Sequence, residues 1–418
     1  MRIDFRKISK QLNTVAISSK SYVHRLLIAS ALSGEASYVY SNIVSKDMEA
    51  TVNCLNNLGA DIVIEDGGFR INRGISKMSA SSIDCNESGS TARFLLPLGA
   101  YLCDELTVVG HGKLPQRPFG PLTQALNEHG VDASSEYLPI TTKGTLTAGD
   151  FSLPGNISSQ YITGLLFVLP LLEKDSRILL TTNLESKGYI DITLDVLKSF
   201  GIKIDFQDNI FTIPGGQKYQ SVKEVYAEGD WSNSAYLLGM GALSGQVEIS
   251  GLNPNSLQGD RAVLDILQKF GALVSVTKDT VKVEKNVLHG IDTDVSQIPD
   301  LVPGIAVIAS FADSDTRLRH VERLRIKESD RIESVKALLE AFGKKAVCKK
   351  YSDGEDLIIC AADSNSTSYA VVDSFNDHRI VMAAFLGAWG MCCELELTGE
   401  NAINKSYPGF FDLFVSKE

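Results

Sequence analysis

Six apolar, helix-like runs in the sequence each begin with a side chain that can form hydrogen bonds. These starting residues recur at intervals of 69 to 77 positions: Ser21, Ser90, Gln160, Asp230, Asp300 and Asp377. The first turn of a helix carries unpaired N–H groups and a partial positive charge, which together bind anions. Basic residues accompany several of the starts, as Lys20, Arg93 and Arg379 do. The pattern predicts phosphate or carboxylate sites, although any single start can equally be an ordinary capped helix.

Other cations cluster in three short segments, at residues 113–118, 325–331 and 405–408. The middle segment, RIKESDR, mixes both signs of charge, and such a run is usually a solvated face. At the start of a helix that faces a cleft, its arginines would suit bidentate binding of phosphate or carboxylate. Glu328, in the same segment, would then be an acid for proton transfer.

The elements that position these groups follow from an internal repeat. Five glycines each follow a similar apolar segment at intervals of 70 to 72 residues: Gly59, Gly130, Gly201, Gly271 and Gly343. Short alternating segments come next, which indicates a helix ended by glycine and followed by a β-hairpin. Combined with the six helix starts, these markers predict six units of helix, strand, helix and hairpin.

The six units predict an α/β protein of two domains. The sixth unit ends without a hairpin, while residues 2–17 contain strand-like segments ahead of the first helix. We therefore predict that the N-terminal strands complete the last unit. Units one to three would form one domain, residues 19–228, and units four to six the other, residues 229–418 with 1–18. A cleft between two domains is a common place for a ligand.

Composition excludes several classes of protein. The chain has 418 residues, of which 44% are hydrophobic, so two sizeable cores are expected. Its net charge of −11 argues against a nucleic-acid partner. It has no apolar run of about 18 residues and no signal-peptide pattern at its start, which predicts a cytoplasmic protein without a membrane partner. Seven cysteines without a CxxC pair and six histidines without metal-ligand spacing argue against a disulfide framework and a metal site.

A series of motifs, in this order and spacing, resembles the 5-enolpyruvylshikimate-3-phosphate synthase family over essentially the whole chain. The motifs are SKSYVHR (19–25), ESGSTARFL (87–95), LPQRPFG (114–120), GNISSQYITGLL (155–166), ESKGYIDIT (185–193), AEGDWSNSAYLL (227–238), IPD (298–300), RIKESDR (325–331), NDHR (376–379) and NKSYPGFF (404–411). The family's fold, an inside-out α/β barrel with three βαβαββ-type units in each of two domains, agrees with the repeat.

The resemblance implies an enzyme of the shikimate pathway to chorismate and the aromatic amino acids. It would transfer the enolpyruvyl group of phosphoenolpyruvate to the 5-hydroxyl of shikimate 3-phosphate and release phosphate, as a monomer without metal or organic cofactor. The residues implied for shikimate 3-phosphate are Ser21, Arg25, Ser158, Ser159, Gln160, Ser186, Tyr189, Asp300, Arg323 and Lys327. Those implied for phosphoenolpyruvate are Lys20, Gly89, Arg117, Gln160, Arg331, Arg379 and Lys405.

Three residues have implied catalytic roles. Asp300 would take the proton of the attacking hydroxyl, Glu328 would protonate the methylene carbon, and Lys20 would assist the departing phosphate. Because the implied groups are split between the two domains, we expect an open form that substrates close.

The chain departs from the family pattern at Ile17-Ser18, where Pro-Gly is common, and at two positions near the implied site. Glu87 stands where asparagine is common, next to the implied phosphoenolpyruvate pocket, and could pair with Arg93. Arg323 stands where some members use asparagine on the shikimate phosphate. Gly89 is typical of glyphosate-sensitive members, so we expect inhibition by glyphosate that competes with phosphoenolpyruvate.

Two other functions fit parts of the pattern. The related enolpyruvyl transferase that acts on UDP-N-acetylglucosamine has a cysteine in a Gly-Gly-Cys loop before its Arg-Pro, whereas residues 111–118 here contain none. A non-enzymatic anion-binding scaffold would explain the caps and cations but not the acids Asp300 and Glu328 among them.

Overall fold

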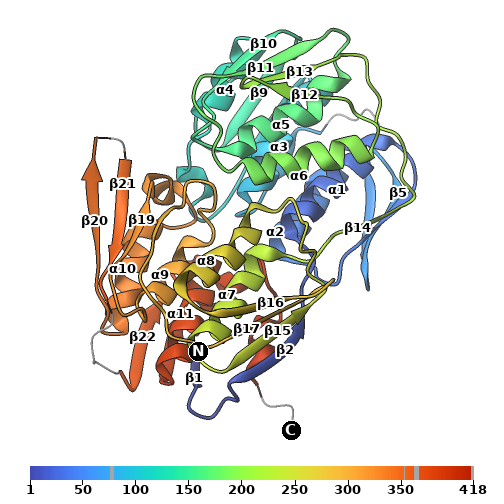
Figure 1. Cartoon of the computed structure of the whole chain (residues 1–418). Coiled ribbons are helices and arrows are strands. Elements are labelled where there is room, and N and C mark those ends of the chain that lie inside the picture. Colours follow the sequence, from blue (N-terminus) through green and yellow to red (C-terminus); the bar gives the residue numbers. More distant parts are fainter. Residues whose placement is uncertain (76–79, 353, 362–366, 416–418) are drawn as a thin grey trace. The chain divides into compact units, whose positions relative to one another are not determined.

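The computed structural model describes residues 1–75, 80–352, 354–361 and 367–415. The chain divides into two compact units (Figure 1). Unit 1 consists of Met1–Ile17 and Glu228–Glu418, and unit 2 of Ser18–Ala227. The predicted domains, residues 19–228 and residues 229–418 with 1–18, stay a prediction.

Unit 2 repeats one pattern three times, and its helices and strands are bounded as follows. The first repeat has α1 (Lys20–Ser33), β3 (Ser37–Tyr40), α2 (Lys46–Asn57), β4 (Asp61–Glu65) and β5 (Gly68–Arg73). The second has β6 (Ser82–Asp84), α3 (Gly89–Leu102), β7 (Glu105–Val109), the short 3₁₀ helix η1 (Leu114–Gln116), α4 (Gly120–Asn127), β8 (Val131–Ala133) and β9 (Ile140–Gly144). The third has β10 (Asp150–Leu153), α5 (Ser159–Val168), η2 (Leu169–Leu171), β11 (Ser176–Leu180), α6 (Lys187–Ser199), β12 (Asp205–Gln207) and β13 (Ile210–Ile213), with β14 (Glu224–Tyr226) after it.

Unit 1 repeats the same pattern. Its N-terminal part contributes β1 (Arg2–Asp4) and β2 (Gln11–Val15). The fourth repeat has α7 (Trp231–Leu243), β15 (Gln246–Ser250), η3 (Gly259–Ala262), α8 (Val263–Phe270), β16 (Leu273–Val276) and β17 (Thr280–Glu284). The fifth has β18 (Asp292–Asp294), α9 (Val302–Ala309), β19 (Thr316–Arg319), η4 (Glu322–Ile326), α10 (Arg331–Ala341), β20 (Ala346–Tyr351) and β21 (Gly354–Ile359). The sixth has β22 (Tyr369–Asp373), α11 (His378–Met391), β23 (Glu394–Thr398), η5 (Glu400–Lys405) and η6 (Phe410–Leu413).

The five marker glycines lie just after α2, α4, α6, α8 and α10, as predicted. Each has a positive φ, between 69° and 104°, which a residue with a Cβ rarely adopts. The left-handed residue turns the chain out of the helix, and an antiparallel hairpin follows each one: β4/β5, β8/β9, β12/β13, β16/β17 and β20/β21. The local sequence therefore fixes where the second helix of each of these repeats ends.

Each sheet combines one parallel pair with antiparallel neighbours. The orders are β14-β3-β5-β4, β6-β7-β9-β8 and β10-β11-β13-β12 in unit 2, and β16-β17-β15-β2, β18-β19-β21-β20 and β1-β23-β22 in unit 1. In repeats two, three, five and six the strand before the first helix runs parallel to the strand after it, as in β6/β7 and β22/β23. The strand–helix–strand segment is thus a compact crossover that covers its own sheet.

The N-terminal strands depart from the prediction that both complete the last unit. β1 does pair antiparallel with β23 of the sixth repeat, with Ile3 opposite Leu395. β2 instead lies parallel to β15 of the fourth repeat, with Leu12 opposite Val247. β14, the strand before α7, takes the matching place beside β3 of the first repeat. Because β2 and β14 have the same alternating pattern, the sequence alone does not reveal that they exchange repeats.

The first helix of each repeat is buried on nearly every side. In unit 1, α7, α9 and α11 pack on one another, and Figure 1 shows them together with the sheets around them. Every residue of α7 and of α9 is buried. In unit 2, α3 packs closely on α5. The starts of these central helices are the positions at which the sequence places its polar groups.

Close packing of α3 on α5 depends on Gly164. A Cβ at Gly164 would lie 2.3 Å from the carbonyl oxygen of Arg93 and 3.2 Å from Cγ of Pro97. Pro97 has no N–H to donate to that carbonyl, four residues earlier in α3. The two helices therefore approach at backbone contact, where no flexible side chain can move aside.

Gly164→Ala should destabilise the protein by about 1–3 kcal/mol, because the added methyl group overlaps backbone atoms. Gly239→Ala in α7 is the matched control, since its Cβ would meet only the ends of flexible side chains, Ile308 at 2.9 Å and Leu386 at 3.3 Å. We expect Gly239→Ala to change stability by less than about 1 kcal/mol, because alanine also favours the helix. Urea unfolding followed by circular dichroism measures both, and equal losses would contradict this account of α3 and α5.

Candidate active site

Three helix starts in unit 1 bring cations around one carboxylate, Asp300. This residue lies just before α9, and its Oδ1 is 2.8 Å from Nη1 of Arg331, the first residue of α10. Its Oδ2 is 3.2 Å from Nη2 of Arg379, in the first turn of α11. Lys327, on the loop before α10, places Nζ 3.8 Å from Oδ1. Asp300, Lys327, Arg331 and Arg379, all predicted site residues, thus form one cluster, here called the unit 1 cluster.

Arg331 connects this cluster to two further acids. Its side chain is 1% exposed, and Nη2 lies 2.8 Å from the Glu328 carboxylate while Nε lies 2.8 Å from Asp377. Burial alone lowers the pKa of Arg331, but Asp377, Glu328 and Asp300 raise it well above its ordinary value. The guanidinium is therefore permanently charged and holds Asp300 and Glu328 on either side of itself.

Asp377 also belongs to the site, although in the sequence it has only the pattern of an ordinary N-cap. It does cap α11, accepting a hydrogen bond from the N–H of Arg379 at 2.9 Å. The same fully buried carboxylate also accepts from Ser329 at 3.0 Å and from Arg331. The cap thus fixes the start of α11 to the segment before α10. Its place two residues before Arg379 in NDHR was the available signal.

Asn233, on α7, was missed by sequence analysis and supports Arg379 from the other side. Its Oδ1 accepts from Nη1 of Arg379 at 3.3 Å, while its amide nitrogen donates to Asp230 and Ser406. Asp230 is the N-cap of α7 and accepts from the N–H of Asn233. Asp230 and Asn233 both belong to the motif DWSN, but in the sequence a helix cap is enough to account for that motif. All three central helices of unit 1 therefore contribute to the surroundings of Arg379.

The charges of the unit 1 cluster follow from its burial and its ion pairs. Burial raises the pKa of Asp300, but Arg331, Arg379 and Lys327 outweigh it and hold that pKa well below its ordinary value. Burial, together with Arg323 and Arg331, lowers the pKa of Lys327 to about 8 in spite of Asp300. At neutral pH the carboxylate is ionised and Lys327 is mostly protonated.

Arg323 and Lys405, the other predicted groups of unit 1, lie on neighbouring segments. Arg323 is part of η4, and its Nη1 donates to the carbonyl of Ser296 at 3.4 Å. Lys405 ends η5, and its Nζ donates to the carbonyl of Asn376 at 2.7 Å, one residue before the cap of α11. Their contacts place them beside the loops that carry the cluster.

In unit 2, guanidinium groups lie against the start of α3. A Cβ on Gly89 would be 2.9 Å from Nη1 of Arg117 and 2.6 Å from Nη1 of Arg93. Arg93 also donates to Oε1 of Gln160 at 3.1 Å, and Gln160 donates to the hydroxyl of Ser90 at 2.9 Å. Gly89, Arg117 and Gln160, three predicted residues, therefore come together at the adjoining starts of α3 and α5. The structure places the Glu87 carboxylate against Gly112.

Another part of the predicted set surrounds Arg25 in α1. Its Nε donates to the hydroxyl of Thr193 at 2.8 Å and its Nη2 to the carbonyl of Tyr189 at 3.0 Å. The Arg25 guanidinium also donates to the carbonyl of Ser21 and lies 5.0 Å above the ring of Phe94. Burial lowers the pKa of Arg25 to about 10, which still leaves it charged at neutral pH.

The remaining predicted residues of unit 2 occupy helix starts. Lys20 begins α1 and pairs with Asp47 at 2.7 Å. Ser158 caps α5 by accepting from the N–H of Gln160 at 3.3 Å, and Ser159 is the first residue of that helix. Ser186 precedes α6 with a φ of 54° and is buried.

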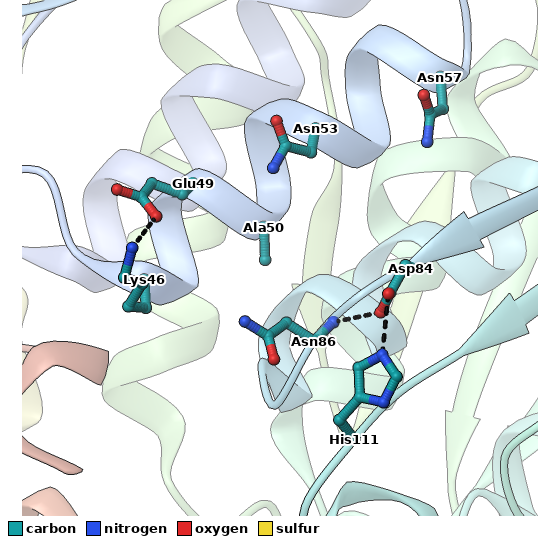
Figure 2. Close-up of a pocket in the computed structure, with 8 residues that line it drawn as sticks. All are labelled: Lys46, Glu49, Ala50, Asn53, Asn57, Asp84, Asn86 and His111. Atoms are coloured by element: carbon teal, nitrogen blue, oxygen red, sulfur yellow. Dashed lines mark hydrogen bonds and ion pairs between the residues drawn. The ribbon is translucent and has the colours of Figure 1, made fainter. Parts of the chain in front are cut away.

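A pocket of about 390 Å³ in unit 2 contains none of the predicted site residues (Figure 2). It lies along the polar face of α2, where Lys46 pairs with Glu49 at 2.7 Å. On its other side Nε2 of His111 is 2.8 Å from Asp84. Within the described ranges no group of acids, histidines and cysteines is arranged to hold a metal ion. No described helix is long and apolar enough to cross a membrane.

The model of the EPSP synthase family, described as 3-phosphoshikimate 1-carboxyvinyltransferase, matches residues 5–414. A protein of that name from Clostridium acetobutylicum is 42% identical over 406 residues, covering 94% of this chain and 92% of the relative. Another from Clostridium novyi is 38% identical over 411 residues, covering 95% and 92%.

Solved structures share the fold at lower identity. EPSP synthase from Acinetobacter baumannii superposes with a TM-score of 0.77 at 21% identity, covering 96% of this chain and 94% of that one. The enolpyruvyl transferase NikO from Streptomyces tendae superposes with a TM-score of 0.73 at 14% identity, covering 97% and 94%. These likenesses confirm the predicted fold class, and the family match together with the Clostridium relatives shows that this chain belongs to the EPSP synthase family.

Proposed function

We propose that this enzyme transfers the enolpyruvyl group of phosphoenolpyruvate to the 5-hydroxyl of shikimate 3-phosphate and releases phosphate. The two Clostridium relatives are named for this activity, and each aligns with this chain over 92% of its length. The observation that supports it most directly is the unit 1 cluster, where Asp300 is held by three cations and Glu328 shares one of them. A passive anion site would contain the cations without two acids among them.

The chemistry needs one base and one acid at separate atoms. The 5-hydroxyl oxygen bonds to C2 of phosphoenolpyruvate while its proton leaves, and C3 gains a proton, which gives a tetrahedral intermediate. C3 then loses a proton, the bond from C2 to the phosphate oxygen breaks, and phosphate departs. We assign the hydroxyl proton to Asp300, the C3 proton to Glu328, and assistance to the departing phosphate to Lys20.

Ligand binding would make Asp300 a better base. Arg331 and Arg379, assigned to phosphoenolpyruvate, and Lys327, assigned to shikimate 3-phosphate, are the groups that hold the pKa of Asp300 low. Substrate phosphate and carboxylate would compete for these cations, because arginine binds both bidentately. The carboxylate would then lose part of its stabilisation, and its pKa would rise when the hydroxyl is present.

The remaining assignments follow the same physical argument. In unit 2, Gly89, Arg117 and Gln160 would contact phosphoenolpyruvate, because guanidinium groups lie against a helix start without a side chain. The hydroxyl-bearing and cationic groups assigned to shikimate 3-phosphate there are Ser21, Arg25, Ser158, Ser159, Ser186 and Tyr189. In unit 1, Lys405 is assigned to phosphoenolpyruvate and Arg323 to shikimate 3-phosphate. A monomeric, cytoplasmic enzyme without cofactor stays a prediction.

Phosphate release from phosphoenolpyruvate should require shikimate 3-phosphate as the acceptor. Measurement of inorganic phosphate with each acceptor in turn tests this. UDP-N-acetylglucosamine should give no release above background. Release with UDP-N-acetylglucosamine but not with shikimate 3-phosphate would indicate the related transferase. If no phosphate is released with either acceptor, the proposed reaction is contradicted.

Asp300→Asn and Glu328→Gln should each lower kcat by about 10²–10⁴-fold, the usual contribution of a general acid or base. The two variants should differ in exchange at C3. If Glu328 delivers the C3 proton, Glu328→Gln loses incorporation of solvent deuterium into the methylene group along with product formation. Glu333→Gln is the control, because this exposed acid lies in the first turn of α10 and pairs with Lys336. If Glu328→Gln incorporates as much deuterium as the wild type, another group delivers the C3 proton.

The KM for shikimate 3-phosphate should rise as the pH increases through about 8, because Lys327 loses its charge there. Lys327→Arg should remove this rise, since arginine stays protonated throughout that range. Steady-state kinetics between pH 6.5 and about 9.5 would compare the two proteins. A rise of the same size in Lys327→Arg would show that another group titrates.

A further inference from the structure

A buried acid that sequence analysis did not consider lies behind the unit 1 cluster. Asp260 belongs to η3 and its side chain is 3% exposed. It accepts a hydrogen bond from the hydroxyl of Ser232, the second residue of α7. Two residues earlier, Gln258 accepts from the N–H of Trp231 at 3.1 Å and donates to the carbonyl of Gly229 at 2.8 Å. Residues 258–260 therefore clasp the first turn of α7.

This turn is the one that supports Arg379. Asn233 follows Ser232 directly and accepts from the Arg379 guanidinium. Asp260 is thus two side chains away from the arginine that pairs with Asp300. Any change in the charge of Asp260 acts on the unit 1 cluster through buried protein, where electrostatic interactions are screened less than in water.

The charged groups around Asp260 are mostly acids. Asp300 and Asp230 disfavour its ionised form, and Arg379 favours it. Arg261, next to it in η3, is half-buried, whereas the charged residues of α8, Asp265 and Lys269, are exposed. Burial first, and then Asp300, raise the pKa of Asp260 to about 6, although the hydrogen bond from Ser232 opposes the rise.

We propose that Asp260 is a positioning residue that takes up a proton from solvent when anionic substrate binds, and so keeps the unit 1 cluster receptive to negative charge. This inference rests on the proposed function. Asp300 and Asp377 already lie against Arg331 and Arg379, and a further ionised carboxylate would oppose an incoming phosphate. A protonated Asp260 still bonds to Ser232, so the first turn of α7 keeps its place.

The sign of the linkage follows from the charges. A bound anion disfavours ionised Asp260, so the complex holds its proton to a higher pH than the free protein does. Affinity is therefore greatest below the free-protein pKa, near 6, and falls as the pH rises from there to the pKa of the complex. If binding raises that pKa by about one unit, about half a proton is taken up midway between the two values.

Titration calorimetry with shikimate 3-phosphate alone measures this uptake. At each pH between about 5.5 and 8, buffers of different ionisation enthalpy give the number of protons bound with the ligand. The ligand phosphate also titrates near pH 6, but its contribution is common to all variants. The decisive quantity is the difference between wild type and Asp260→Asn, which keeps the shape of the side chain and cannot ionise.

We expect Asp260→Asn to take up as much as one proton fewer than the wild type when it binds shikimate 3-phosphate. Its affinity should also depend less on pH. Asp265→Asn, an exposed acid on α8, is the matched control and should behave as wild type. Ser232→Ala removes the hydrogen bond that lowers the pKa of Asp260. It should move the uptake to higher pH, which provides a second test if Asp260→Asn does not fold.

The outcomes separate this inference from the proposed function. Uptake by Asp260→Asn equal to that of wild type, with catalysis intact in the wild type, would overturn the role of Asp260 alone. An unchanged uptake profile in Ser232→Ala would do the same. A wild-type protein that neither binds shikimate 3-phosphate nor releases phosphate with it would overturn both proposals.

Discussion

The buried guanidinium of Arg331 is the contact on which the site of unit 1 depends. A charged side chain that is 1% exposed needs hydrogen-bonding partners in place of water, and here the carboxylates of Asp300, Glu328 and Asp377 lie 2.8 Å from the guanidinium. Removal of one partner from such a buried pair typically costs about 3–5 kcal/mol. The three acids come from the starts of α9, α10 and α11, so the arginine also sets the spacing of these helices. Stability and chemistry thus share the same ion pairs.

In unit 2 a buried guanidinium is stabilised by neutral groups. Its buried Arg25 bonds to the Thr193 hydroxyl and to backbone carbonyls, and a chain of hydrogen bonds from His24 through Thr51 and Thr91 links α1, α2 and α3. Burial lowers the pKa of His24 well below its ordinary value, so this histidine is a neutral member of the chain. Unit 2 therefore offers cations held mainly by dipoles, whereas the unit 1 cluster also offers acids.

Local patterns predicted the elements, and distant contacts decided the rest. Gly59 and its four equivalents each fix a helix end through their own φ, so the repeat could be read without tertiary information. The partners of β2 and β14 could not be predicted in this way. The two strands have the same alternating pattern and compete for similar places, and only the packing of the whole unit determines which place each one takes. Asp377 and Asp260 show the same limit in the site. The sequence indicates only a helix cap at Asp377 and singles out nothing at Asp260, because their pairing with Arg331 and Ser232 depends on distant segments of the chain.

The pairing of β2 with β15 has a consequence for synthesis on the ribosome. Unit 2 is one continuous stretch, but unit 1 needs residues from both ends of the chain. β2 leaves the ribosome first and its partner β15 only after all of unit 2 has been translated, roughly 10 to 50 s later at ordinary elongation rates. During that interval the nascent chain carries a strand without its native neighbour. All the strands of the unit 2 sheets have been translated by then. Translation therefore favours an order of assembly in which unit 2 folds before unit 1.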